Sequence, residues 1–251
     1  MGKQIDIEGI KIENVSYEDI LCLIKEKLSR KETFTLNYVN AFILLQLNKN
    51  EDFRKIINSF SFLYNDGIGI YFASKFLYGK NSLKQRITGT DLYYYILDYA
   101  NKMNLKCFFF GGGEESIKLL PGVLKLKYPN IIIAGMISRD LTENKLIIEK
   151  IKNSNADILF VGIGTPHQEK WISKYSKIIG IPIQLSVGSG IDFISGYRKR
   201  APKYIQKIGL EWLYRIFLEP GRLWKRYIFG IPIFVFKILI LKFKLLFKRG
   251  N

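Results

Sequence analysis

Cysteine and histidine are scarce in this sequence, and their scarcity excludes several kinds of chemistry. Among 251 residues there are two cysteines, Cys22 and Cys107, and a single histidine, His167. The cysteines lie far apart in apolar stretches, so we expect reduced thiols and a cytoplasmic protein, not a disulfide-linked secreted one. Because no cluster of His, Cys or paired Asp residues has ligand spacing, the sequence predicts no metal and no other cofactor.

Long hydrophobic runs and the common nucleotide-binding motifs are also missing. No uninterrupted apolar run approaches the ~20 residues of a membrane-spanning helix, and residues 1–10 lack the apolar segment of a signal peptide. Neither the G-x-G-x-x-G fingerprint nor the Walker A lysine pattern occurs, which disfavours a dehydrogenase or a P-loop NTPase. The chain is nevertheless 48% hydrophobic, enough for a substantial folded core.

Acidic residues are scarce in the C-terminal fifth of the chain. The whole sequence has 39 Lys and Arg against 22 Asp and Glu, a net charge of +17. Residues 198–251 hold 14 of the basic residues and 2 glutamates, a net charge of +12, which leaves +5 for residues 1–197. Because this charge lies beside apolar residues, we expect an anionic membrane surface as partner and not a nucleic acid. We predict one folded domain over residues 1–197 and a basic, apolar appendage over residues 198–251 that associates with the membrane.

The end of the chain has the composition of a helix that lies at a membrane surface. Residues 227–247 are strongly apolar but are interrupted by a Gly-Ile-Pro segment and by three lysines. On a helical wheel Lys237, Lys244 and Lys248 fall within about 40° of one another, and the remaining face is Ile, Leu and Phe. This pattern predicts a helix that lies in the membrane interface and hence a peripheral membrane protein. For the cytoplasmic protein expected from the thiols, that surface is the cytoplasmic face of the cell membrane. The alternative is a terminal helix packed on the core or on a second subunit of a homo-oligomer.

Strand patterns alternate with helical patterns along the chain. The expected strands are residues 33–39, 62–64, 105–110, 131–137, 157–161 and 181–187. Helical patterns separate them, including one capped by Thr90 or Asp91. The alternation predicts an α/β fold, a Rossmann-like and mostly parallel sheet with helices on both faces, followed by the C-terminal helical, membrane-associating appendage.

Three glycine turns follow predicted strands, at residues 111–113, 162–164 and 188–190. Any one of them is often only a connection between a strand and a helix. Because the carboxyl ends of parallel strands meet at one edge of a sheet, the three together predict a nucleotide or phosphate cleft. Asp192, just after the third turn, either binds a sugar hydroxyl or holds that turn.

The second glycine turn leads into a polar cluster at the start of a predicted helix. Thr165, His167, Gln168 and Glu169 follow residues 162–164 and surround a proline. Side chains at this place in an α/β sheet commonly face a ligand, and a helix N-terminus favours an anionic one. An ordinary strand-to-helix connection is the alternative.

Asp66 is the carboxylate best placed to act as a base. It follows a short buried strand and precedes two glycines that open a helix, in the order Asn65-Asp66-Gly67-Ile68-Gly69. A carboxylate at a strand end in an apolar cleft can take the proton of a hydroxyl. The alternative is a turn or cap residue, because Asn-Asp-Gly is a common turn sequence. Asp91 fits a helix cap better than a catalyst.

Arginines are the expected partners of a diphosphate, since we predict no metal to neutralise it. Guanidinium groups and backbone N–H groups then take over that charge. The candidates are Arg86, Arg200, Arg215, Arg222 and Arg226. For most of them a solvated or lipid-facing position is the alternative.

Several of these segments together resemble one enzyme family. Asn65 to Gly69 is similar to a D-G-x-G motif, residues 86–92 to R-x-x-G-x-D-L, and residues 162–171 to G-x-G-x-P-K-Q-E-x-W. The triple glycine, residues 188–193, Arg200-Ala201-Pro202, residues 209–212 and residues 214–222 follow in the same order as in that family. From about residue 35 to residue 227 the chain resembles the WecG/TagA/CpsF glycosyltransferases.

The resemblance implies an inverting, metal-independent glycosyltransferase. Such an enzyme moves a sugar, N-acetylmannosamine or another hexose, from a UDP-sugar to a polyprenyl-diphosphate-linked sugar in cell-surface polysaccharide or teichoic acid synthesis. By the same resemblance residues 1–197 are the catalytic domain, and Asp66 is its base. The appendage over residues 198–251 then completes the active site, because its Arg215 and Arg222 neutralise the departing UDP. The expected substrate- and nucleotide-binding residues are Asn40, Gly67, Arg86, Asp91, Gly111, Gly112, Gly113, Gly162, Gly164, Pro166, Gln168, Glu169, Gly188, Asp192 and Arg200. A non-catalytic nucleotide- or lipid-binding scaffold of the same fold is the competing reading.

The sequence departs from the family pattern at two places. His167 stands where the family usually has Lys, so any charge at that position depends on pH. The family's T-x-N motif has two possible matches, one ending at Asn37 and one ending at Asn40. We choose Asn40 because of its place relative to Asp66, and Tyr38 then stands where a Thr hydroxyl is expected.

Overall fold

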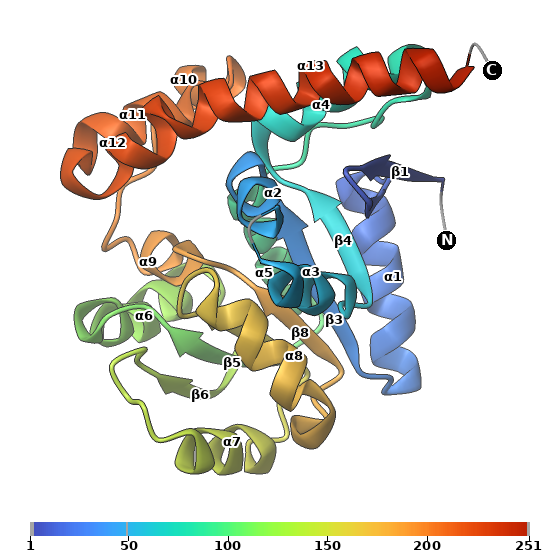
Figure 1. The fold of residues 1–251 in the computed structure, drawn as a ribbon. Coiled ribbons are helices and arrows are strands. Elements are labelled where there is room, and N and C mark those ends of the chain that lie inside the picture. The colour runs from blue at the N-terminus through green and yellow to red at the C-terminus, as the bar shows by residue number, and fades with distance from the viewer. Residues whose placement is uncertain (1–2, 49, 250–251) are drawn as a thin grey trace.

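In the computed structural model, a six-stranded parallel sheet lies between two layers of helices (Figure 1). The structure describes residues 3–48 and 50–249. The side chains of Arg222, Lys225, Arg226, Lys248 and Arg249 lie outside the described part, so the expectation for Arg222 and the place of Lys248 on the helical wheel are not addressed by it. The predicted α/β fold, with a parallel sheet covered on both faces, is confirmed.

The sheet has the strand order β4-β3-β8-β7-β5-β6. Its strands are β3 (Phe34–Val39), β4 (Phe62–Asn65), β5 (Lys106–Gly111), β6 (Ile132–Ile137), β7 (Ile158–Gly162) and β8 (Ile183–Ser186). Every residue of β3, β4, β7 and β8 is buried, as expected for strands covered on both faces. Phe109 and Phe160 stack across β5 and β7 with ring centroids 5.0 Å apart.

Helices cover both faces of the sheet. One face is covered by α1 (Tyr17–Arg30), α5 (Gly89–Lys102), α6 (Glu114–Lys127) and α9 (Gly190–Ile194). The other face is covered by α3 (Glu51–Asn58), α7 (Asn144–Asn153) and α8 (His167–Ile179). Two further helices, α2 (Ala41–Leu47) and α4 (Gly67–Tyr78), the latter followed by the 3-10 turn η1 (Gly79–Asn81), lead from the ends of β3 and β4 toward the C-terminal helices.

The cap expected for α5 is wrong. The helix begins at Gly89 after an extended Thr88, so Thr90 and Asp91 lie inside its first turn. The Asp91 carboxylate accepts a hydrogen bond from the Thr88 hydroxyl through its Oδ2. The residue at the N-cap position is Thr88, and its side chain makes no capping hydrogen bond.

The chain changes direction between β5 and β7, and a glycine is required there. The connection after β5 runs outward to β6, whereas the connection after β7 runs the other way to β8. Gly111 ends β5 with φ +134°, and a Cβ on it would lie 2.3 Å from the carbonyl carbon of Gly162 on β7. Only glycine allows the two strand ends to come this close. In parallel sheets such a reversal is the usual place for a ligand.

The sequence analysis missed a hairpin at the N-terminus. Strands β1 (Gln4–Ile7) and β2 (Ile10–Glu13) pair in antiparallel fashion and turn at Glu8 and Gly9. The alternate residues Ile5, Ile7, Ile10 and Ile12 are buried, which is the pattern of a half-buried hairpin.

The C-terminal segment lies across the edge of the sheet where the strands end. It comprises α10 (Lys203–Lys207), α11 (Glu211–Leu218), α12 (Pro220–Ile228) and α13 (Gly230–Arg249), and α13 runs over α2 and α4 (Figure 1). Phe234 and Ile238 of α13 are buried and join the main hydrophobic core. Among the helices in the described residues, none combines the length and apolarity needed to cross a membrane.

Candidate functional site

A cavity of about 620 Å³ lies between the ends of β3 and β4 and the C-terminal segment. At one end are Asn40, Asp66, Arg86 and Thr88, which come from the sheet edge and from the loop before α5. Trp212 and Arg215 of α11 close that end from the opposite side. The cavity therefore combines residues from both ends of the chain.

Asp66 has its carboxylate in this cavity, where donors from two neighbouring segments hold it. Its Oδ1 accepts a hydrogen bond from the backbone N–H of Gly89 at 2.9 Å, and its Oδ2 accepts one from Asn40 Nδ2 at 3.2 Å. Asp66 occupies the N-cap position of α4, yet its side chain makes no capping hydrogen bond. The cap alternative therefore fails for the side chain, which is fixed by two neighbouring segments of the site.

Asn40 performs two tasks at the end of β3. Its Oδ1 accepts a hydrogen bond from the N–H of Ile43 at 3.0 Å, which caps α2, while its Nδ2 donates to Asp66. The other candidate, Asn37, is fully buried in β3 and donates to the carbonyl oxygen of Tyr38. The structure thus places Asn40, and not Asn37, against Asp66.

Of the predicted arginines whose side chains the structure describes, Arg86 and Arg215 line the cavity. Arg86 donates from Nη2 to the carbonyl oxygen of Gln206 at 3.0 Å. Arg215 lies with its guanidinium 5.5 Å from the centre of the Phe193 ring. Its Nε is buried and has no hydrogen-bond partner within residues 3–48 and 50–249. A buried guanidinium nitrogen without a partner is a ready donor to an anionic ligand.

Gly209 lets the C-terminal segment approach this close. Its φ is +79°, and a Cβ on it would lie 2.2 Å from Ile68 Cδ1 and 2.9 Å from Arg86 Nη1. Any larger residue there would push α11 away from α4 and Arg86.

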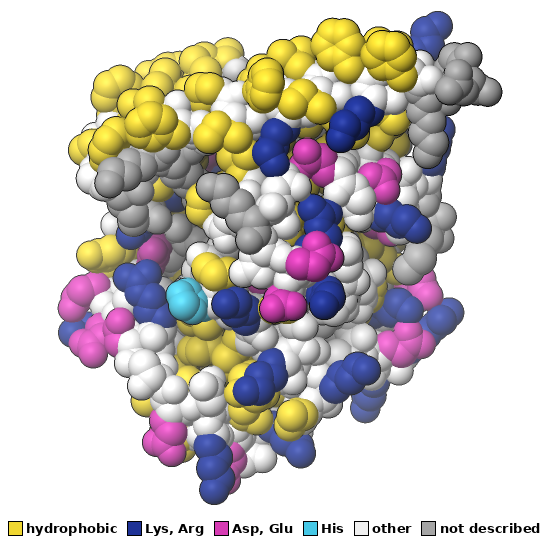
Figure 2. Space-filling model, in the orientation of Figure 1, with side chains coloured by type: hydrophobic (Ala, Val, Ile, Leu, Met, Phe, Trp, Pro, Cys, Tyr) yellow, Lys and Arg dark blue, Asp and Glu magenta, His cyan; other side chains and the backbone are white. Residues whose placement is uncertain are grey.

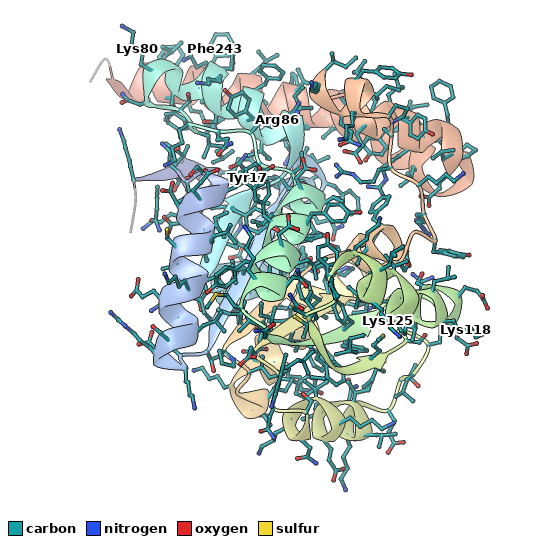
Figure 3. The ribbon with its side chains drawn as sticks, turned by 180° about the vertical axis from the view of Figure 1, so that it is seen from behind. Tyr17, Lys80, Arg86, Lys118, Lys125 and Phe243 are labelled. Atoms are coloured by element: carbon teal, nitrogen blue, oxygen red, sulfur yellow. The ribbon has the colours of Figure 1, made fainter. Side chains whose placement is uncertain are left out.

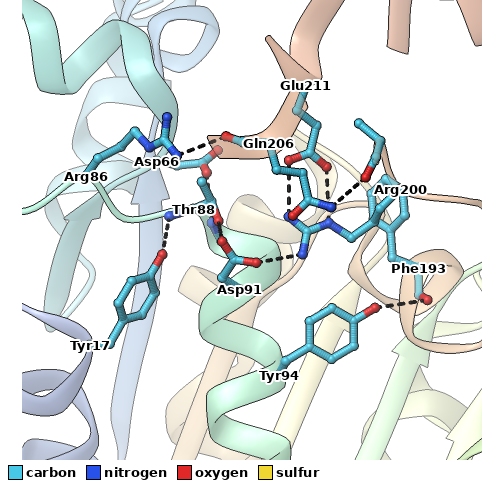
Figure 4. Close-up of polar contacts among 12 residues, drawn as sticks. Tyr17, Asp66, Arg86, Thr88, Asp91, Tyr94, Phe193, Arg200, Gln206 and Glu211 are labelled. Atoms are coloured by element: carbon cyan, nitrogen blue, oxygen red, sulfur yellow. Dashed lines mark hydrogen bonds and ion pairs between the residues drawn. The ribbon is translucent and has the colours of Figure 1, made fainter. Parts of the chain in front are cut away.

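Arg200 and Asp91 do not line the cavity but pair with each other beside it (Figure 4). Arg200 Nη1 lies 2.6 Å from Asp91 Oδ1, and its Nη2 lies 3.1 Å from Glu211 Oε2. Burial opposes the charged form of Arg200, but the hydrogen bonds to Glu211 and Asp91 outweigh it and raise the pKa of the guanidinium. The three side chains form a clamp, the Arg200 clamp, between the start of α5 and α11.

A second polar cluster joins the ends of β3, β7 and β8. Glu169 Oε1 accepts hydrogen bonds from Thr165 Oγ1 at 2.8 Å and from Gln168 Nε2 at 2.9 Å. Gln168 Nε2 also donates to the Tyr38 hydroxyl at 3.0 Å, and Gln168 Oε1 accepts from the N–H of Gly188 at 2.9 Å. Gln168 and Glu169 are fully buried, and burial raises the pKa of the Glu169 carboxyl.

The three glycine turns lie apart from the Asp66 cavity. Among the residues that the structure describes, none from 111–113, 162–164 or 188–190 lines the cavity. The single cleft expected from the sequence is therefore replaced by two separate regions. Tyr93 bridges the two parts. A Cβ on Gly89, beside Asp66, would lie 2.9 Å from the Tyr93 hydroxyl, and a Cβ on Gly190 would lie 2.7 Å from its ring.

Asp192 is buried behind these turns and holds them together. It accepts a hydrogen bond from Ser116 Oγ at 2.6 Å and forms an ion pair with Arg198 Nε at 3.2 Å. Arg198 in turn pairs with Glu219 at 2.8 Å. Sequence reasoning missed Arg198 and Glu211 as partners, although both lie in or near the motifs that carried the family resemblance.

A second cavity of about 510 Å³ lies on the other side of the β7 end. His167, Lys170, Lys174 and Arg139 line it together with the ring of Trp171. Within the described part of the chain, no group of three or more His, Cys, Asp or Glu residues is arranged to hold a metal ion.

Comparison with known proteins agrees with this geometry. The model of the glycosyl transferase WecG/TagA/CpsF family matches residues 5–248. An N-acetylglucosaminyldiphosphoundecaprenol N-acetyl-beta-D-mannosaminyltransferase of Bacillus subtilis (strain 168) is 33% identical over 217 residues, which cover 86% of this chain and 83% of the relative. A protein of the same name from Staphylococcus aureus (strain NCTC 8325 / PS 47) is 30% identical over 246 residues, 96% of this chain and 94% of the relative. The chain therefore belongs to the WecG/TagA/CpsF family of glycosyltransferases.

Proposed function

We propose that the enzyme transfers an N-acetylmannosaminyl group from a UDP-sugar to a polyprenyl-diphosphate-linked N-acetylglucosamine, in the synthesis of a teichoic acid or another cell-surface polymer. The names of the two relatives support this choice of donor sugar and acceptor. The observation that carries the proposal is the Asp66 carboxylate, oriented by Asn40 and Gly89 inside a cavity that also holds Arg86 and Arg215.

The proposed reaction is a direct displacement at the anomeric carbon. Asp66 accepts the proton of the acceptor hydroxyl, and the oxygen of that hydroxyl forms a bond to the anomeric carbon. The bond between that carbon and the UDP oxygen breaks at the same time, and UDP leaves with the electron pair. Attack on the side opposite to the leaving group inverts the configuration. The two hydrogen bonds on Asp66 hold the base in place before the acceptor arrives.

The developing charge on UDP needs fixed positive partners. Arg215 has an unpartnered buried Nε, and Arg86 lies in the same cavity. Arg222 is proposed to act with them on the strength of the family motif. The glycine turns at residues 111–113 and 162–164 flank the reversal between β5 and β7, and with the turn at residues 188–190 they are proposed to form the nucleotide side of the site. The buried side chains of Gln168 and Asp192 are proposed to position these turns, because Gln168 accepts a hydrogen bond from the N–H of Gly188 and Asp192 accepts one from Ser116.

The C-terminal segment is proposed to hold the enzyme against the cytoplasmic face of the membrane, where a lipid-linked acceptor resides. In Figure 2 hydrophobic side chains gather along the top of the molecule, where Figure 1 shows α11, α12 and α13. The exposed apolar residues there include Phe217, Leu218, Trp224, Phe229, Phe236, Phe243 and Phe247. An apolar patch of this extent on a basic segment fits an anionic lipid surface.

A panel of UDP-sugars, offered with lipid-linked N-acetylglucosamine in the presence of EDTA, tests the function. We expect transfer from UDP-N-acetylmannosamine and release of UDP in equal amount. Binding of UDP-sugars without transfer to any acceptor would favour a non-catalytic scaffold instead.

A further inference from the structure

The Asp66 cavity has a second, apolar half that the transfer chemistry does not use. Beyond the polar end, its lining comes mainly from the helices α4 and α13, and α2 contributes Ala41, Phe42 and Leu45. From α4 come Ile68, Phe72 and Phe76, which are four residues apart and so lie on one face of the helix. From α13 come Val235 and Leu239, also four residues apart. Two apolar stripes thus face each other across a groove that begins at Asp66.

The groove has a buried floor and open walls. Phe234 and Ile238 form part of its lining and are buried, 7% and 6% exposed. In contrast, Phe72 is 57% and Val235 is 49% exposed. A packed floor beneath exposed apolar walls leaves a channel that opens toward the apolar surface of the C-terminal segment.

Contacts at both ends fix the distance between the two helices. Near Asp66, a Cβ on Gly69 would lie 3.6 Å from Ala41 Cβ and 3.7 Å from Phe234 Cε1, so α4, α2 and α13 meet closely there. At the far end, Lys242 Nζ donates to the carbonyl oxygen of Leu77 at 3.0 Å and lies 5.6 Å from the centre of the Phe76 ring. Figure 3 shows Lys80, which follows α4, and Phe243 of α13 at the same end of the molecule. These contacts therefore fix the spacing between α4 and α13 at both ends of the groove.

We propose that this groove binds the first isoprene units of the polyprenyl diphosphate acceptor. The inference rests on the proposed function and adds to it a binding site for the lipid part of the acceptor. With the acceptor hydroxyl at Asp66, the acceptor diphosphate lies between that hydroxyl and the groove, and the polyprenyl chain continues between α4 and α13, while Arg86 and Arg215 face the UDP of the donor. From Ile68 to Phe76 the groove runs for about 12 Å along the helix, so the rest of a long chain remains in the bilayer.

In this proposal α13 has two roles, one at the membrane surface and one in the acceptor site. Besides its outward apolar residues, it contributes a wall of the acceptor site through Val235 and Leu239. The lipid then contributes binding energy next to the reacting hydroxyl and not only by anchoring in the membrane, because burial of its apolar surface in the groove is favourable.

Binding of a short isoprenoid diphosphate to the full chain tests the groove without any transfer. Farnesyl diphosphate is titrated in the absence of membranes and of donor, and inorganic diphosphate and a saturated alkyl diphosphate of equal carbon number serve as comparison ligands. We expect farnesyl diphosphate to bind at least tenfold more tightly than inorganic diphosphate. A saturated chain that binds equally well would overturn the isoprenoid assignment and identify the groove as a general hydrocarbon site.

A pair of neighbouring substitutions locates the effect. Val235→Trp fills the groove, whereas Phe236→Trp places the same residue on the outward face, where Phe236 is 63% exposed and does not line the cavity. We expect Val235→Trp to abolish the advantage of farnesyl over inorganic diphosphate and Phe236→Trp to keep it. Equal binding of farnesyl diphosphate by the wild type and Val235→Trp would overturn the proposal. Failure of the transfer reaction would count against the proposed function alone, since the titration does not depend on it.

Discussion

The amide of Asn40 and the carboxylate of Asp66 meet where two neighbouring strands end, with Nδ2 3.2 Å from Oδ2. The register of the parallel pair β3 and β4 brings this about, because Val39 lies opposite Asn65 and the next residue of each strand is one of the two partners. A base and the group that orients it thus come from one strand pairing, although 26 positions separate them in the sequence.

Replacing Asp66 by Asn is expected to abolish transfer and leave the fold intact. The amide keeps the shape of the carboxylate, but it cannot accept the proton of the acceptor hydroxyl. General-base catalysis is worth about 10²- to 10⁴-fold in rate, so we expect a loss in that range. Initial rates with saturating donor measure it, with the circular dichroism spectrum and UDP-sugar binding as controls. A variant with near-normal turnover would remove Asp66 from the mechanism.

Two substitutions at Asn40 separate its two tasks. Serine can still cap α2 but has no group that reaches Asp66 as the Asn40 amide does, whereas alanine loses both interactions. We expect Asn40→Ser to keep the wild-type stability and to lose about ten- to a hundredfold in rate, because the base is no longer held in place. Asn40→Ala should show the same loss of rate and about 1 kcal/mol less stability. Equal rates for wild type and Asn40→Ser would show that the hydrogen bond has no role in catalysis.

The sheet could be predicted from the sequence because the composition of its strands indicates that they are buried on both faces. Runs such as those of β3 and β7 are apolar on both faces, and glycine or Asn-Asp-Gly turns mark where they end. The hairpin of β1 and β2 has an equally clear alternation of buried isoleucines, with Glu8 and Gly9 at its turn, but each strand has only four residues and the hairpin was not predicted.

The partners of the charged residues could not be predicted. Arg200 and Asp91 lie 109 positions apart, and Arg198 and Asp192 were close in sequence but had no visible reason to pair. Such contacts depend on how the C-terminal segment folds back over the sheet, which no local pattern specifies. The same C-terminal segment also closes the Asp66 cavity. The apolar half of that cavity therefore could not be predicted from the sequence either.

Removing the charge of Arg200 is expected to loosen the C-terminal segment. Arg200→Met leaves Asp91 and Glu211 without their shared partner next to a partly buried surface. Hydrogen bonds to charged groups contribute about 1.5–3 kcal/mol each, and partial exposure reduces this, so we expect the free energy of unfolding to fall by about 2 kcal/mol. Denaturant titration measures the change. Lys118→Met, at the exposed ion pair with Glu115, is the control and should have no measurable effect.

Glu169 is expected to make the stability fall as the pH rises. Because burial raises its pKa in the folded state above the ordinary value of 4.5, the folded protein binds this proton more tightly than the unfolded chain. Its contribution is therefore fully present below pH 4.5 and is lost as the pH rises through the raised folded-state pKa. Glu169→Gln cannot ionise, so its stability should decline less than that of the wild type between pH 4 and pH 7. Parallel curves for the two proteins, or an equal change in the exposed variant Glu115→Gln, would contradict this.

The outward face of α13 is expected to bind anionic vesicles, and point substitutions test this better than a truncation. Removing the chain from Tyr227 onward would also remove Phe234 and Ile238 from the core, so lost binding would be ambiguous. Phe243 and Phe247 are 61% and 77% exposed and do not line the Asp66 cavity. They can therefore be changed without opening the core or the site.

The double variant Phe243→Glu and Phe247→Glu should lower vesicle binding more than tenfold, since burial of each Phe is worth about 1.5–3 kcal/mol and each new charge opposes anionic lipid. Leu126→Glu, at an exposed position on α6, makes the same kind of change away from α13 and should have little effect. Cosedimentation with anionic vesicles at low and high salt measures both terms, because salt screens the contribution of the lysines but not that of the buried rings. If the double variant bound as well as Leu126→Glu, the membrane-facing surface would lie elsewhere on the molecule.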